Sequence, residues 1–93
     1  MDSDAYFRKL SFRATHRGTR EADAMVGGFF ERYHHDWSEE QFAWFERLLE
    51  EQDVDIVAWA MRRTAVPAEF QGAMMDMLQR LDFIELPQGL ERK

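Results

Sequence analysis

Residues 20–33 read READAMVGGFFERY and carry the strongest periodic signal in the chain. Apolar residues return every three or four positions, which is the spacing of one face of an amphipathic α-helix. Thr19 is the predicted N-cap, and acids follow it in the first turn, where the helix dipole favours them. The stretch predicts a helix over 20–33 whose apolar face consists of Ala22, Met25, Val26, Phe29, Phe30 and Tyr33.

Two adjacent glycines, Gly27 and Gly28, stand inside this predicted helix. Each costs about 1 kcal/mol of helix stability relative to alanine. Either a neighbouring helix or a partner approaches the backbone closely here, or the glycines are tolerated inside a well-packed helix. The sequence leaves both explanations open.

Helical spacing continues on both sides of this segment. Ser38 and Gln41 have the spacing of a capping box, and Pro67 suits the first position of a helix. Asp53 is a predicted N-cap. We expect further helices over about 6–15, 39–50, 54–63 and 67–81, joined by short connections. The predicted fold is all-α, a small compact bundle of about five helices.

The 93 residues fit one domain, and 45% of them are hydrophobic, which is enough for one core. We expect an ordered core over about 6–82, with a frayed N-terminus and a frayed C-terminal tail. No run approaches the ~18 consecutive apolar residues of a membrane span, and the N-terminus has no targeting signal. We therefore expect a complete cytoplasmic chain that does not insert into a membrane.

Charge is unevenly distributed along the chain. The formal net charge is −6, but residues 1–20 carry +3 and residues 21–93 carry −9. No acid occurs between residues 5 and 20. The acidic body argues against nucleic acid as a partner. The basic segment is either a solvated helix or a face that docks on an acidic partner.

The chain lacks the common signatures of an enzyme. It has no phosphate-binding loop, no dinucleotide fingerprint, no nucleophile elbow and no cysteine. His34 and His35 are adjacent and would point about 100° apart on a helix, which disfavours a shared metal. Trp44 lies off the apolar face of its predicted helix and is a candidate exposed residue. We predict no catalytic residue and no metal site.

The turn before the strongest helix carries the most specific constellation, Arg17-Gly18-x-x-Glu21. Gly18 would make the sharp turn, and Glu21 would reach back toward Arg17. Such a pair would direct the guanidinium outward as a rigid fork for a carboxylate or carbonyl. The alternative is a helix cap with a surface ion pair worth ~0–1 kcal/mol.

Five motifs follow one another along the chain: Arg8-Lys9-Leu10, His16-Arg17-Gly18-Thr19-Arg20-Glu21-x-Asp23, Phe29-Phe30, Arg47-Leu48-Leu49-Glu50 and Asp53-x-Asp55-Ile56-x-x-Trp59. Together they resemble the SdhE family of FAD assembly factors. The resemblance covers about residues 6–82, including Pro67 and the methionine-rich last helix. It departs from the family at His16, often Arg or Lys there, and at Thr19, often Met or Ile.

The resemblance implies a bundle of five helices that is not itself an enzyme. It implies a partner, the flavoprotein subunit of succinate dehydrogenase and possibly of fumarate reductase, on which the chain promotes covalent attachment of FAD to a histidine. We expect no stably bound cofactor, because the FAD belongs to the partner. We also expect a monomer when free, and the mitochondrial matrix if the source is eukaryotic.

The resemblance also assigns residues. It implies a partner-binding role for Arg17, Gly18 and Glu21, and the basic first helix adds His16, Arg13 and Arg8. A second signature, Asp53, Asp55 and Trp59, has a structural role in this interpretation. The alternative function is a helical interaction module without a flavin role, such as a regulator or the antitoxin of a membrane toxin.

Overall fold

The structure is a computed structural model that describes residues 3–84, and all regular elements in this part of the chain are helical. The all-α prediction is therefore confirmed. Of the ends expected to fray, residues 1–2 and 85–93 lie outside the described residues, whereas residues 3–5 already belong to the first helix. The elements are α1 (Ser3–Thr15), α2 (Arg20–Tyr33), the 3-10 helix η1 (His34–Asp36), α3 (Glu39–Leu49), α4 (Asp53–Ala60), the 3-10 helix η2 (Ala68–Phe70) and α5 (Ala73–Arg80).

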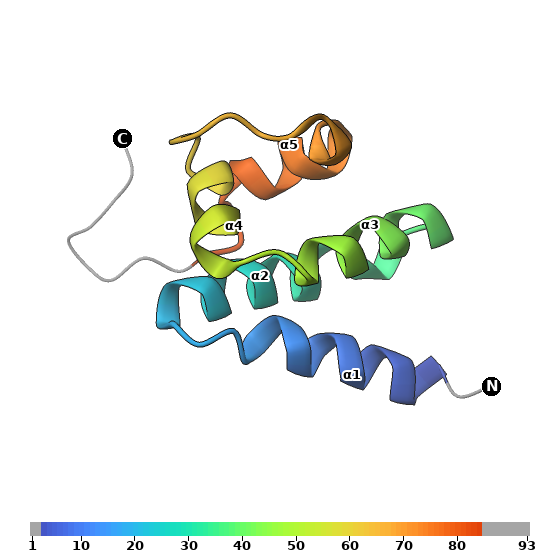
Figure 1. The fold of residues 1–93 in the computed structure, drawn as a ribbon. Coiled ribbons are helices and arrows are strands. Elements are labelled where there is room, and N and C mark those ends of the chain that lie inside the picture. Colours follow the sequence, from blue (N-terminus) through green and yellow to red (C-terminus); the bar gives the residue numbers. More distant parts are fainter. Residues whose placement is uncertain (1–2, 85–93) are drawn as a thin grey trace.

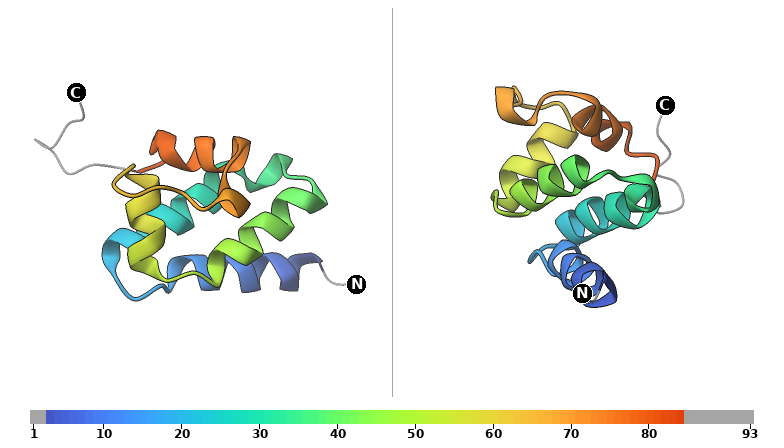
Figure 2. Two further views of the ribbon diagram at one scale, coloured as in Figure 1. Left: turned by 45° about the horizontal axis from the view of Figure 1, so that its top comes forward. Right: turned by 90° about the vertical axis from the view of Figure 1, so that its right-hand side faces the viewer.

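The helices follow one another back and forth across the molecule (Figure 1). α1 and α2 form an antiparallel hairpin, and α3 runs back beside α2. Two further views show α1 along one edge of the bundle and α5 along the opposite edge, with α2 and α3 between them (Figure 2). The connection between α1 and α2 therefore meets the corner where α3 passes into α4.

Local capping sets two of the helix starts as predicted. The Thr19 side chain accepts a hydrogen bond from the backbone N–H of Ala22, so α2 begins at Arg20. Ser38 and Gln41 form the full capping box that begins α3. The prediction for α4 was wrong by one residue, because Gln52 is the N-cap and Asp53 is already helical. The Asp53 side chain therefore does not cap its own helix and can accept a hydrogen bond from another element.

The predicted helix over 67–81 is broken in two. Gln71 is extended, and Gly72 has φ +134°, a conformation that only glycine adopts readily. The break allows Phe70 to pack between two tryptophans, with ring centroids 5.7 Å from Trp44 and 5.4 Å from Trp59. Burial of a large aromatic ring thus outweighs continuation of the helix.

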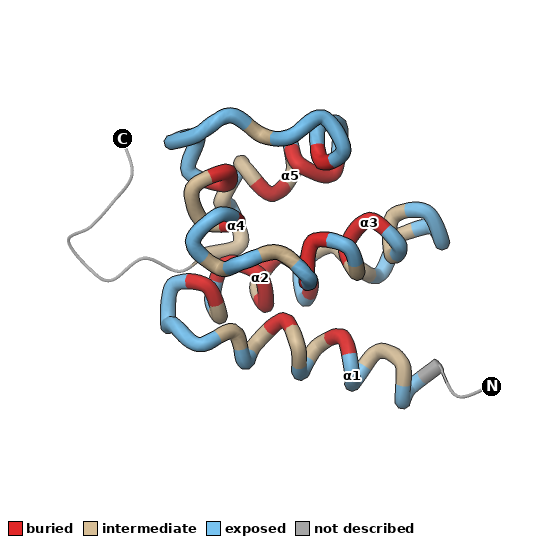
Figure 3. The backbone as a smooth tube through the Cα atoms, viewed as in Figure 1, coloured by how far each residue is buried: buried red, intermediate tan, exposed pale blue. Residues whose placement is uncertain are grey.

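The core lies where α1, α2, α3, α4 and α5 meet, and it corrects one sequence-based prediction (Figure 3). Trp44 is only 7% exposed rather than a surface residue, because η2 covers it. Met61, directly after α4, is 42% exposed because the helix ends at Ala60. The predicted apolar face of α2 is buried or partly buried, and so are Phe42, Phe45, Leu48 and Leu49 of α3.

The paired glycines mark close packing against α2. A Cβ on Gly27 would lie 2.6 Å from the Thr15 side chain of α1, and a Cβ on Gly28 would lie 3.1 Å from the Phe83 ring. Close approach of neighbouring elements is therefore the explanation for both glycines. At Gly27 this contact fixes α1 against α2 next to the turn that joins them.

Candidate partner-binding site

The α1–α2 turn is shaped by one glycine. Gly18 has φ +122°, a backbone conformation that L-residues rarely adopt. A Cβ at this position would make only an ordinary contact, 3.7 Å from Oδ2 of Asp53. Gly18 is therefore required by its backbone angle rather than by crowding inside the chain.

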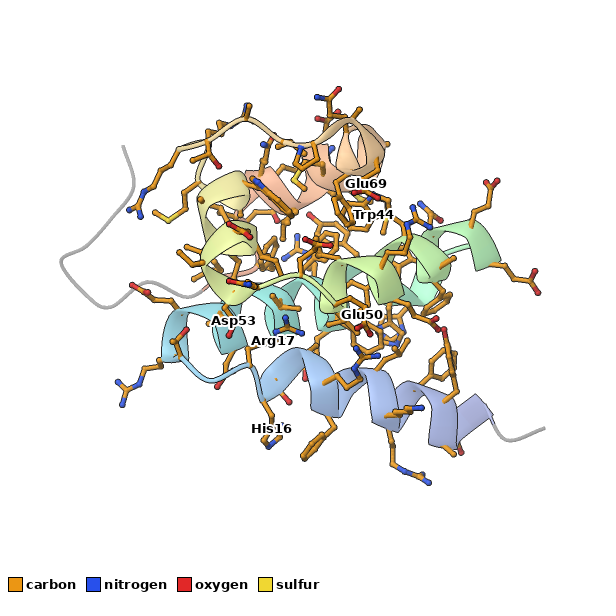
Figure 4. The ribbon with its side chains drawn as sticks, in the orientation of Figure 1. His16, Arg17, Trp44, Glu50, Asp53 and Glu69 are labelled. Atoms are coloured by element: carbon orange, nitrogen blue, oxygen red, sulfur yellow. The ribbon has the colours of Figure 1, made fainter. Side chains whose placement is uncertain are left out.

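Arg17 points into the molecule, and the prediction of an outward fork was wrong. Its Nε donates to Oδ1 of Asp53 at 2.8 Å, and the Arg17 side chain is 9% exposed. Its two terminal nitrogens donate to the backbone carbonyls of Leu49 and Glu51, each at 2.9 Å. Figure 4 shows Arg17 beside Asp53 in the space between the end of α1 and the α3–α4 corner.

This arrangement explains why the turn and the Asp53 segment occur together in the sequence. The last residue of α3, Leu49, and Glu51 in the link to α4 supply carbonyls that the guanidinium satisfies. Asp53 supplies the compensating charge. The expected partner of Arg17, Glu21, is instead exposed in the first turn of α2.

A further residue of the turn was missed by sequence reasoning. Asp23 accepts a hydrogen bond from the backbone N–H of Arg17, and so closes the turn from the α2 side. The signal was present as an acid in the first turn of α2, but it was assigned only to the helix dipole. Both Asp23 and Asp53 therefore fix Arg17, one through its backbone and one through its side chain.

The second signature divides between the turn and the core. Asp53 contacts Arg17, whereas Trp59 is 6% exposed and packs on Phe70. Asp55 is exposed in the first turn of α4, where the helix dipole stabilises an acidic side chain. Two of its three residues thus have clear structural roles in tertiary contacts.

Two further side-chain contacts hold α1 to α3. Arg13 donates to Glu50 at 2.6 Å in an exposed ion pair, so this base is engaged within the chain. The Tyr6 hydroxyl donates to Glu46. Burial and the neighbouring carboxylate raise the pKa of Tyr6 to about 12. Together with Arg17, these residues define the inner side of the segment from α1 to the turn.

The remaining predicted residues of the same segment are exposed. Arg8, His16 and Glu21 are exposed, as is Gly18 at the tip of the turn. His16 extends from α1 on the side away from Asp53 (Figure 4). Its ring stacks on Phe12, which sequence analysis did not select. We call this set, Arg8, Phe12, His16, Gly18 and Glu21, the outer surface.

The histidine pair of η1 has a structural explanation. Nδ1 of His34 lies 2.8 Å from the carbonyl oxygen of Phe30, and the two rings stack with centroids 4.3 Å apart. Within residues 3–84 there is no cluster of three or more potential metal-ligating side chains. In the same range no helix has both the length and the apolar character needed to cross a membrane.

Comparison with known proteins places this arrangement in a family. The sequence model of the family described as the flavinator of succinate dehydrogenase matches residues 8–82. The chain belongs to this family. The matched range includes the α1–α2 turn, the α3–α4 corner and α5, so the Arg17–Asp53 contact lies within the part of the chain that defines membership.

Individual relatives agree with this membership. The FAD assembly factor SdhE of Acetobacter pasteurianus is 39% identical over 62 residues, covering 67% of this chain and 57% of the relative. The mitochondrial succinate dehydrogenase assembly factor 2 of Dictyostelium discoideum is 31% identical over 72 residues, covering 77% of this chain and 51% of the relative. The corresponding protein of Danio rerio is 32% identical over 74 residues, with coverages of 77% and 47%.

The chain therefore spans about half the length of the curated relatives it matches. All three relatives are named as assembly factors rather than as enzymes. They come from a bacterium and from mitochondria.

Proposed function

We propose that this protein is an FAD assembly factor that binds the flavoprotein subunit of succinate dehydrogenase and promotes covalent attachment of FAD to it. Family membership over residues 8–82 is the observation that carries the proposal. The names of the bacterial and mitochondrial relatives support it. The flavoprotein subunit of fumarate reductase is a second candidate partner for the same reaction.

In this proposal the outer surface is the docking face. Glu21 is exposed and can accept hydrogen bonds from a partner donor, and Gly18 presents backbone without a side chain. Arg17 is a positioning residue: its buried hydrogen bonds hold the turn so that Gly18 and Glu21 keep their relative placement. Preorganisation of this kind reduces the entropy lost on binding.

Docking would assist flavinylation through the partner's conformation. Covalent attachment requires FAD and the acceptor histidine, both held by the flavoprotein, to meet in a reactive geometry. A helper that binds one conformer more tightly shifts the population toward it. The chain then needs no catalytic residue and no resident cofactor, and it acts on the FAD of its partner.

Reconstituted flavinylation tests the proposal. The FAD-free flavoprotein subunit is incubated with FAD and this protein, and covalent flavin is read by fluorescence of the denatured band. Wild-type chain should accelerate attachment severalfold. Glu21→Gln should remove most of this acceleration and leave the free energy of unfolding within about 0.5 kcal/mol. Glu31→Gln, an exposed acid further along α2, is the matched control and should behave as wild type.

The outcomes separate the alternatives. Binding of the flavoprotein without any effect on covalent flavin would favour an interaction module that lacks a flavin role. Equal activity of the Glu21 and Glu31 variants would reject the docking assignment. We further propose that the free chain is a monomer and that it acts in the bacterial cytoplasm or the mitochondrial matrix, where the client is assembled.

A further inference from the structure

An aromatic ring stands outside the core on the outer surface. Phe12 is 61% exposed, although it belongs to a helix whose opposite face is buried. Isolated exposed apolar residues are common and need no function. The large hydrophobic residues Val54 and Met61 are also exposed, but they are aliphatic and lie on α4 or at its end.

Phe12 differs from these residues because its position is fixed. The His16 ring stacks on it with centroids 3.9 Å apart and planes inclined by 18°. Nδ1 of His16 lies 2.9 Å from the Phe12 carbonyl oxygen and 3.1 Å from the Thr15 hydroxyl. Thr15 in turn donates to the Ser11 carbonyl at 2.8 Å. The exposed ring is therefore held by a chain of contacts and has little rotamer freedom to lose on binding.

The surroundings of the ring are cationic. Arg8 lies four residues before Phe12 and His16 four residues after it, so the three share one face of the helix. Arg8 and Lys9 are exposed, and no acid occurs between residues 5 and 20. Protein interfaces commonly have an aromatic centre within a polar rim, and a few buried aromatic residues carry most of the affinity.

The ring is also continuous with the proposed docking turn. His16 is next in sequence to Arg17, whose buried contacts set the direction of the turn. The His16 side chain points away from those contacts (Figure 4). A partner that reaches Gly18 and Glu21 is therefore placed to cover the Phe12–His16 stack as well.

We propose that Phe12 is the aromatic anchor of this docking surface. It enters an apolar pocket on the flavoprotein subunit, and carboxylates at the pocket rim face Arg8. His16 supports the ring from the side of the turn. The inference rests on the proposed function, since it names how the same partner is held.

Affinity measurements with matched variants test the anchor. The probe is the purified FAD-free flavoprotein subunit, titrated with the full chain by calorimetry. Phe12→Ala should weaken binding about 10–100-fold, as truncation of a central aromatic residue does. Met61→Ala removes an exposed apolar side chain at the end of α4 remote from Asp53, and it should change affinity less than about twofold.

A double-mutant cycle tests the role of His16. His16→Ala should weaken binding about 3–10-fold, because the ring loses its support. In the Phe12→Ala background the same change should add less than about twofold, since no ring remains to be supported. Fully additive losses would show that His16 contacts the partner independently and would overturn the supporting role.

Each remaining outcome is decisive. Wild-type binding that Phe12→Ala leaves unchanged overturns the anchor, while the proposed function stands. No binding by the wild type overturns both. Concentration-dependent dimerisation that Phe12→Ala abolishes would identify a second copy as the occupant and overturn the anchor. Loss of fold is excluded as the cause if Phe12→Ala keeps the helical circular dichroism and the melting temperature of the wild type. Phe12→Leu, which keeps an apolar side chain, should weaken binding too.

Discussion

The two sides of the segment from α1 to the turn contrast sharply in their chemistry. On the inner side, Arg17 is almost fully buried and each of its three nitrogens has an acceptor on α3, α4 or the link between them. On the outer side, Phe12 and Glu21 are exposed. The same short segment thus supplies both a structural clamp and an exposed surface. Neighbouring residues of one sequence motif can therefore face either the interior of the protein or the solvent.

Removing the clamp should give the largest effect on stability. Arg17→Ala leaves Asp53 without its buried counter-charge and leaves the carbonyls of Leu49 and Glu51 without donors. We expect the free energy of unfolding to fall by about 3 kcal/mol in urea denaturation. Flavoprotein binding should weaken as well, because the turn loses its fixed geometry.

The matched control is the other arginine of the inner side. Arg13→Ala breaks the exposed ion pair with Glu50 and should cost less than about 1 kcal/mol. Arg17→Lys should recover only part of the loss, because one ammonium group cannot reproduce a planar fork that reaches three acceptors. Equal costs for the alanine variants of Arg13 and Arg17 would contradict the distinction between a buried clamp and an exposed pair.

The turn glycine should give an intermediate effect that separates backbone strain from binding. Gly18→Ala should lower the free energy of unfolding by about 1–2 kcal/mol, because φ is +122° at this position. Gly72→Ala, at φ +134° and far from the turn in sequence, should lower it similarly. Only the Gly18 variant should weaken flavoprotein binding. A binding loss of the same size in both variants would show that strain alone lowers affinity.

A smaller effect than at Arg17 or Gly18 is expected at Tyr6, whose hydroxyl joins α1 to α3 through Glu46. Its neutral phenol is favoured in the folded state, so this contribution is present below pH 10 and is lost as the pH rises to about 12. Tyr6→Phe should cost about 1 kcal/mol at pH 8 through the lost hydrogen bond to Glu46. The difference between wild type and variant should shrink between pH 10 and pH 12 in denaturation curves. If the difference in the free energy of unfolding stays constant from pH 10 to pH 12, ionisation of Tyr6 does not contribute to the pH dependence of stability.

Local sequence signals predicted α2 and α3 well, because their information is local. The Thr19 cap and the Ser38–Gln41 capping box act over three residues, so they can be read without knowledge of the fold. The break at Gly72 could not be predicted in this way. It depends on Phe70 packing between Trp44 and Trp59, which come from two other helices.

The sequence by itself determined that the chain is all-α and that its α1–α2 turn needs glycine. Only the tertiary structure decided where Arg17 points. Its acceptors, Asp53 and the carbonyls of Leu49 and Glu51, are more than thirty residues away in the chain and meet it only when α3 and α4 form their corner. A side chain turns toward the partners that offset its desolvation, and those partners exist as a set only in the folded protein.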